Sequence, residues 1–114
     1  MDVFKIKGHQ GYIYLSLEEV FGFPNETSHF GGYDVRGVFE VRSCYYFAKG
    51  ELWFSTGEVF SFYNQLKDAY KSISGEASFI NSEANAEIKI VFNAKRGHVV
   101  ISGYFKEQAH WKMN

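Results

Sequence analysis

The stretch STGEVFSFYNQLKDAYKSISG, residues 55–75, decides the fold because it predicts one long helix. It opens with Ser55 three residues before Glu58, the S/T-x-x-E capping box in which each side chain satisfies a free backbone amide. Gly75 is a natural stop because glycine adopts the left-handed conformation that ends many helices. We therefore expect an amphipathic helix over about 57–74. Its apolar face comprises Val59, Phe62, Leu66, Ala69 or Tyr70, and Ile73.

Upstream of this helix the sequence alternates apolar and polar residues, as β-strands do. Residues 3–7 and 12–17 predict a hairpin, and Tyr33–Ser43 predicts a long strand with one apolar and one charged face. Residues 18–32 lose the alternation and predict a loop. Gly37 marks a candidate bulge. A second hairpin is expected from residues 45–48 and 52–54 across the turn Lys49-Gly50-Glu51.

Downstream of the helix the pattern returns to strands, at residues 77–80, 87–93 and 98–105. Residues 110–113 begin another strand that stops at once, which suggests a chain truncated at its C-terminus. One helix among about seven to eight mostly antiparallel strands predicts an α+β fold, with the helix packed on the sheet. We expect one domain over residues 1–114.

Composition excludes several classes of protein. Twelve basic and thirteen acidic residues give a net charge of −1, which shows no overall bias toward nucleic acid or an anionic membrane. Cys44 has no second cysteine, so an internal disulfide and a cysteine-based zinc site are both excluded. The start of the chain does not resemble a signal peptide, and no apolar run is long enough to cross a bilayer. The expected location is the cytoplasm.

Motifs for catalysis are missing from the sequence. The four histidines (His9, His29, His98 and His110) lack metal-ligand spacing, and no nucleotide-binding glycine motif occurs. Cys44 lies in a strand-like run and is expected to be a buried small hydrophobe. Glu18 and Glu19 are adjacent and should point in different directions. Asp34 with Arg36, and Glu40 with Arg42, are interpreted as surface charge pairs. We predict no catalytic, cofactor-binding or metal residues, and hence no enzyme.

The most suggestive feature is an acidic, aromatic segment. Residues 18–35 hold four acids and no Lys or Arg, and they include Phe21, Phe23, Phe30 and Tyr33. Carboxylates steer a basic partner and aromatic rings anchor it, so the segment could form a protein-binding surface. In the alternative interpretation it is a solvated loop whose phenylalanines fold back into the core.

Five short motifs follow one another along the chain: FGFP at 21–24, GGYDVRG at 31–37, LWFSTGE at 52–58, SGEA at 74–77 and GHVVISG at 97–103. In this order the chain resembles the WapI-like immunity proteins of bacterial contact-dependent and polymorphic toxin systems, best over about residues 33–103. The resemblance implies a small cytoplasmic protein that binds a cognate toxin domain, often a nuclease, and blocks it without a cofactor. The family pattern continues with more strand beyond Asn114.

The leading hypothesis is therefore an immunity protein that neutralises a cognate toxin C-terminal domain by stoichiometric binding. The alternative is a small-ligand-binding α+β domain or pocket enzyme, which would show a large polar cavity with a perturbed titratable group. A third possibility is assembly, such as a homodimer through a strand edge near His110. The residues predicted to contact the toxin are Glu18, Glu19, Phe23, Glu26, Phe30 and Asp34.

Overall fold

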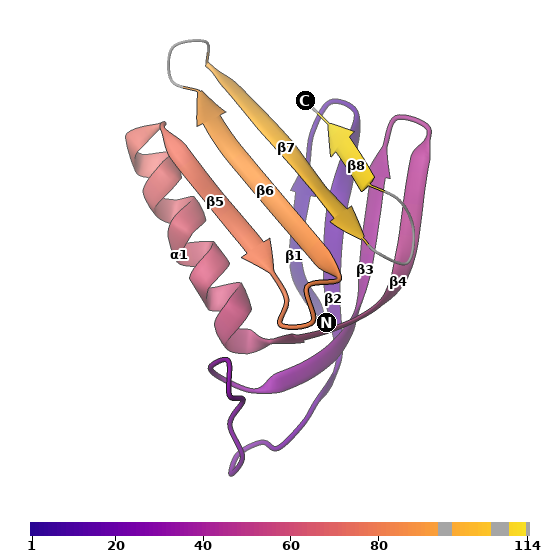
Figure 1. Ribbon diagram of the computed structural model, residues 1–114, viewed down its shortest axis with the longest axis vertical. Coiled ribbons are helices and arrows are strands. Elements are labelled where there is room, and N and C mark those ends of the chain that lie inside the picture. The colour runs from indigo at the N-terminus through magenta and orange to yellow at the C-terminus, as the bar shows by residue number, and fades with distance from the viewer. Residues whose placement is uncertain (94–96, 106–109, 114) are drawn as a thin grey trace.

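The computed structural model describes residues 1–93, 97–105 and, as backbone, 110–113 (Figure 1). Four strands come first, then the helix, then four more strands, and these elements confirm the α+β class. Their bounds are β1 Asp2–Lys7, β2 Gly11–Val20, β3 Asp34–Ser43, β4 Tyr46–Ser55, α1 Thr56–Ser72, β5 Gly75–Ile80, β6 Ala86–Asn93, β7 His98–Phe105 and β8 His110–Met113.

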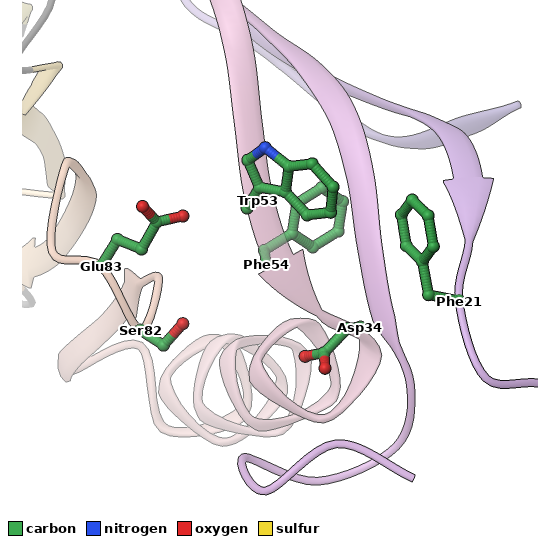
Figure 2. A pocket seen from close by; sticks show the side chains of 6 residues that line it. All are labelled: Phe21, Asp34, Trp53, Phe54, Ser82 and Glu83. Atoms are coloured by element: carbon green, nitrogen blue, oxygen red, sulfur yellow. The ribbon is translucent and has the colours of Figure 1, made fainter. Parts of the chain in front are cut away.

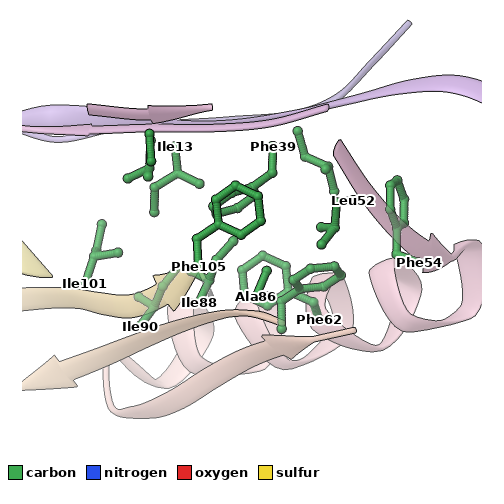
Figure 3. Packing of buried hydrophobic residues seen from close by; sticks show 14 of the residues in the cluster. Ile13, Phe39, Leu52, Phe54, Phe62, Ala86, Ile88, Ile90, Ile101 and Phe105 are labelled. Carbon is green, nitrogen blue, oxygen red and sulfur yellow. The ribbon is translucent and has the colours of Figure 1, made fainter. Parts of the chain in front are cut away.

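The strands divide into two antiparallel sheets, an arrangement that the sequence pattern left open. The N-terminal sheet has the order β1-β2-β3-β4 and the C-terminal sheet has the order β5-β6-β7-β8. The apolar faces of the two sheets meet in one core, seen edge-on in Figure 3. At its centre Phe39 and Phe105, one from each sheet, lie edge to face with ring centroids 5.3 Å apart. The sheets thus bury each other.

Helix α1 runs beside β5 and closes one side of this sandwich (Figure 1). The buried ring of Phe62 contacts Phe4 of β1 at 5.6 Å and Phe79 of β5 at 5.9 Å between centroids. The capping box is confirmed: the Glu58 amide donates to Ser55 Oγ, and the Ser55 amide donates to Glu58 Oε1. The helix ends slightly earlier than predicted, because Ile73 takes the left-handed cap conformation.

The hairpin predicted across Lys49-Gly50-Glu51 is wrong. Strand β4 runs unbroken through these residues, with Gly50 directly opposite Phe39. The alternation continues because residues 48, 50, 52 and 54 all point inward, so a sequence that resembles a turn serves as mid-strand. The turn lies instead between β3 and β4, at Cys44, whose φ is 55°. Cys44 is exposed there, which contradicts the predicted burial.

The bulge lies on β2, opposite the glycine predicted to carry it. Leu17 pairs with Gly37 and Glu19 pairs with Arg36, so Glu18 is the extra residue. A Cβ on Gly37 would lie 1.9 Å from the Ser16 carbonyl oxygen, so only glycine fits there. Strand β2 also extends to Val20, and the predicted loop shortens to residues 21–33.

Charge pairs on the outer face of the N-terminal sheet form across strands. Arg36 contacts Glu19 of β2 at 3.4 Å and Glu51 of β4 at 3.5 Å. Glu40 pairs with Lys49 at 3.8 Å. The pairs expected along β3, Asp34 with Arg36 and Glu40 with Arg42, are replaced by these, because cross-strand neighbours lie closer than residues two apart on one strand.

Candidate functional site

The loop of residues 21–33 projects from one end of the sandwich, below the start of α1 in Figure 1. It is fastened to the helix start by backbone hydrogen bonds. The Thr56 amide donates to the Tyr33 carbonyl at 2.9 Å, and the Tyr33 amide donates to Thr56 Oγ1 at 2.9 Å. The Gly57 amide donates to the Gly31 carbonyl at 3.1 Å. A long loop with these anchors holds a defined shape.

Glycines make this close approach possible. A Cβ on Gly57 would lie 2.6 Å from the Gly31 carbonyl carbon and oxygen. A Cβ on Gly32 would lie 2.0 Å from Thr56 Oγ1, and Gly32 has a φ of 64°, which side chains disfavour. The motifs GGYDVRG and LWFSTGE therefore meet in space at the helix start.

The loop phenylalanines Phe23 and Phe30 point outward, which contradicts the alternative that they fold into the core. Phe23 is 70% exposed and Phe30 is 53% exposed. Phe23 packs edge-on against Tyr33, with centroids 5.2 Å apart, and the Tyr33 hydroxyl donates to the Pro24 carbonyl. Exposed rings on a fastened loop are the kind of surface that anchors a protein partner.

All four predicted acids are exposed, but they fall in two places. Glu18 and Glu19 lie on the outer face of the N-terminal sheet. Glu18 borders a hollow with Glu40 and Lys49, and Glu19 pairs with Arg36. The β2 bulge puts both glutamates on the same face, so the expectation that they diverge is wrong. Glu26 lies in the loop and Asp34 at the start of β3.

Beside Asp34 the structure shows a pocket that sequence reasoning missed, here called the acidic–aromatic pocket (Figure 2). Its volume is about 300 Å³. One wall is an aromatic pair, Phe21 stacked on Trp53 with centroids 5.1 Å apart. Asp34 and Glu83 bring carboxylates from separate segments, β3 and the β5–β6 loop. The lining comprises Phe21, Asp34, Trp53, Phe54, Ser82 and Glu83.

Asn81 holds the β5–β6 loop against the pocket. Its side chain is 2% exposed, and its Nδ2 donates to the Trp53 carbonyl at 2.8 Å. Its Oδ1 accepts from the amides of Asn85 and Ala86, both at 3.1 Å. A buried amide with every polar atom bonded fixes the loop, so Ser82 and Glu83 stay beside β4. The sequence signal was the turn-forming run NSEAN at 81–85 after a strand.

The Glu58 carboxyl at the start of α1 lies near the charge of Asp34. Burial raises the pKa of the Glu58 carboxyl, the nearby charge of Asp34 raises that pKa further, and hydrogen bonds from Ser55 oppose the rise. Neither Asp34 nor Glu83 forms an ion pair or side-chain hydrogen bond within the described part of the chain.

Elsewhere a larger hollow, about 740 Å³, lies at the opposite end between β1, α1 and the C-terminal sheet. Its wall is mostly apolar, with Ile6, Leu66 and Phe92 among the lining residues. Over the described residues no three His, Cys, Asp or Glu side chains group as metal ligands. No helix in that part of the chain has the length and apolar character to span a membrane.

Together these features define a two-sheet α+β sandwich with an acidic, aromatic end and no assembled catalytic group among the described residues. Residues 4–114 match the model of the immunity protein WapI-like family. The chain belongs to this family. The family points to toxin neutralisation and a non-enzymatic role. Comparisons with curated proteins and with solved structures gave no match.

Proposed function

We propose that this chain is a cytoplasmic immunity protein that binds the C-terminal domain of a cognate toxin, one to one, and so neutralises it. The proposal rests on one observation: this member of the family has an end at which acidic and aromatic side chains are exposed. The exposed rings Phe23 and Phe30 lie with Glu26 on a loop fastened to the start of the helix, and the other predicted acids lie on β2 and at the start of β3. That combination supplies steering charge and anchoring area without a large rearrangement.

A nuclease is the toxin class that fits this surface best. Nucleases bind phosphates through clustered Lys and Arg, so their substrate face is basic. The predicted contacts Glu18, Glu19, Glu26 and Asp34 would meet such a face, with Phe23 or Phe30 filling an apolar hollow on the toxin. Binding there would exclude the nucleic acid.

The test is a calorimetric titration of this protein with the C-terminal domain of whatever large secreted protein is encoded directly upstream. The expected result is one-to-one binding with a Kd in the nanomolar range, about −12 kcal/mol. Co-expression should restore growth to cells that make the toxin. A folded chain that binds no such domain and gives no protection would overturn the proposal.

An occlusion assay then tests the nuclease assignment. A short labelled DNA or RNA should bind a catalytically inactive toxin, and this protein should displace it in a one-to-one ratio. If the complex still binds nucleic acid, the acidic end does not cover the substrate face, although neutralisation itself stands.

A homodimer through a strand edge remains a separate proposal. Among the described strands β8 is the outer one of the C-terminal sheet, so its outer edge near His110 is where a second copy would pair. Sedimentation of the full chain tests it, because a monomeric mass at high concentration rejects the dimer.

A further inference from the structure

We propose that the acidic–aromatic pocket holds one arginine side chain of the bound protein. The inference deepens the proposed function and rests on it for the identity of the partner. It adds Phe21, Trp53 and Glu83 to the predicted contacts. Its starting point is the pocket itself, an open hollow with an aromatic wall and two carboxylates (Figure 2).

The aromatic wall selects a flat cation. Trp53 is 40% exposed although it stacks on Phe21, so part of the indole is accessible to a ligand. A guanidinium group stacks on such a ring through its π face, and tryptophan gives the strongest cation–π attraction. The Trp53 Nε1–H already donates to Glu51 at 3.2 Å, which fixes the orientation of the indole.

Two carboxylates supply the matching charge. Asp34 and Glu83 approach from different segments, and within the described residues neither has a basic partner. A guanidinium carries five donors in a rigid plane, so it can bond carboxylates on two sides while its face lies on the indole. An ammonium group satisfies the charge but lacks the stacking plane, so lysine should bind more weakly.

The pocket is small and already shaped. A volume of about 300 Å³ is at the lower limit of ligand sites, roughly 300–1,000 Å³, and suits a side chain. The Phe21 amide donates to the Asp34 carbonyl at 2.9 Å, and Asn81 joins the opposite wall to β4. Because both walls are held before binding, little ordering cost remains.

The first experiment uses the full chain alone and follows the Trp53 indole N–H by NMR. A spectrum of Trp111→Phe assigns it, since the chain has two tryptophans. Arginine, citrulline and lysine are titrated as N-acetyl amides. Arginine should give a saturable shift with a Kd of about 10 mM, while neutral citrulline gives none and lysine is weaker. No saturable arginine shift up to about 100 mM, or an equal one with citrulline, overturns the inference.

Matched variants locate the site. Asp34→Asn with Glu83→Gln keeps the side-chain shapes and should weaken arginine binding at least about tenfold. Glu76→Gln removes one charge from an exposed pair with Lys89 away from the pocket, and it should leave binding within about twofold. If the distant substitution weakens binding as much, the effect is general charge and the pocket is not the site.

A second experiment separates this inference from the proposed function. In the toxin complex, the Asp34→Asn/Glu83→Gln protein should lose at least about tenfold in affinity, mainly through faster dissociation. Toxin binding unaffected by these variants overturns the pocket assignment and leaves the immunity function standing. If the chain binds arginine in the pocket but does not bind the toxin, the pocket is confirmed as an arginine site and the proposed immunity function is wrong.

Discussion

The two ends of the sandwich differ in charge and in shape. One end displays acids and exposed rings on the 21–33 loop and beside the acidic–aromatic pocket. At the other end, β1 finishes at Lys7, Arg42 lies over the Phe47 ring at 4.8 Å, and α1 finishes near Lys71. That second end also contains the apolar hollow of about 740 Å³.

The contrast shows what a net charge conceals. A net charge of −1 over the whole chain is compatible with strong local fields of both signs. The fold places acidic residues at one end of the strands and basic residues at the other. Glu18 and Glu19 lie near the end of β2, and Asp34 lies at the start of β3. These two strand ends are neighbours because β2 and β3 pair antiparallel. Local charge determines which partner is steered, so the acidic end is the surface to test against a basic partner.

The largest expected effect comes from neutralising the acidic end. Alanine at Glu18, Glu19, Glu26 and Asp34 should slow toxin association about 100-fold at low salt, with a smaller effect at high salt. Stopped-flow association rates at several salt concentrations measure it. The matched variant carries alanine at Lys7, Arg42 and Lys71 and should associate no more slowly than the parent. Equal losses at both ends would contradict a specific acidic surface.

The next prediction separates the cost of steric crowding from the cost of backbone strain, by comparing two glycines that have the same φ. Gly32 and Gly97 both have a φ of 64°, but only Gly32 is crowded, by Thr56 Oγ1. Gly97→Ala should therefore cost about 1 kcal/mol, for strain alone. Gly32→Ala should cost about 2–3 kcal/mol, because the loop must also move off the helix. Urea unfolding measures both free energies, and equal costs would show that the anchoring is weak.

Much of the fold could be predicted because its signals are local. The capping box at Ser55 and Glu58 needs only four residues, and the alternation of β3 needs only one strand. Two sheets instead of one could not be predicted, since an apolar face looks the same whether a helix or a second sheet covers it. The run Lys49-Gly50-Glu51 misled for a related reason, because a glycine between two charged residues is typical of a turn but also fits a strand in which only Lys49 and Glu51 point outward.

Only part of the candidate site could be predicted from the sequence. The acids and rings of residues 18–35 are contiguous in the chain, so composition alone revealed them. Trp53 and Glu83 come from distant segments, and only the pairing of β3 with β4 and the hydrogen bond from Asn81 to β4 bring them to Asp34. Contacts between such distant residues depend on topology, which a single sequence does not reveal.

A smaller effect is expected for the exposed loop rings. Phe23→Ala and Phe30→Ala should each weaken toxin binding about tenfold, chiefly by faster dissociation, since buried aromatic anchors act on complex lifetime. Phe47→Ala is the matched control, because that ring is 44% exposed at the other end. Surface plasmon resonance gives the rates. A loss confined to Phe47→Ala would move the interface to the opposite end.

The smallest effect is a pH dependence of stability that reports the surroundings of Glu58 at the acidic end. Burial, with a further contribution from Asp34, raises the folded-state pKa of Glu58 above its ordinary value of 4.5. The folded chain therefore binds more protons between these two pKa values, and raising the pH through that window lowers the free energy of unfolding.

Glu58→Gln keeps an acceptor for the Ser55 amide but cannot ionise, so this contribution to the slope should disappear. Asp34→Asn should reduce it, whereas Glu76→Gln, far from the helix start, should leave it unchanged. Urea unfolding from pH 4 to pH 8 measures the slopes, and a Glu58→Gln protein as pH-dependent as the parent would show that the folded-state pKa of Glu58 is not raised.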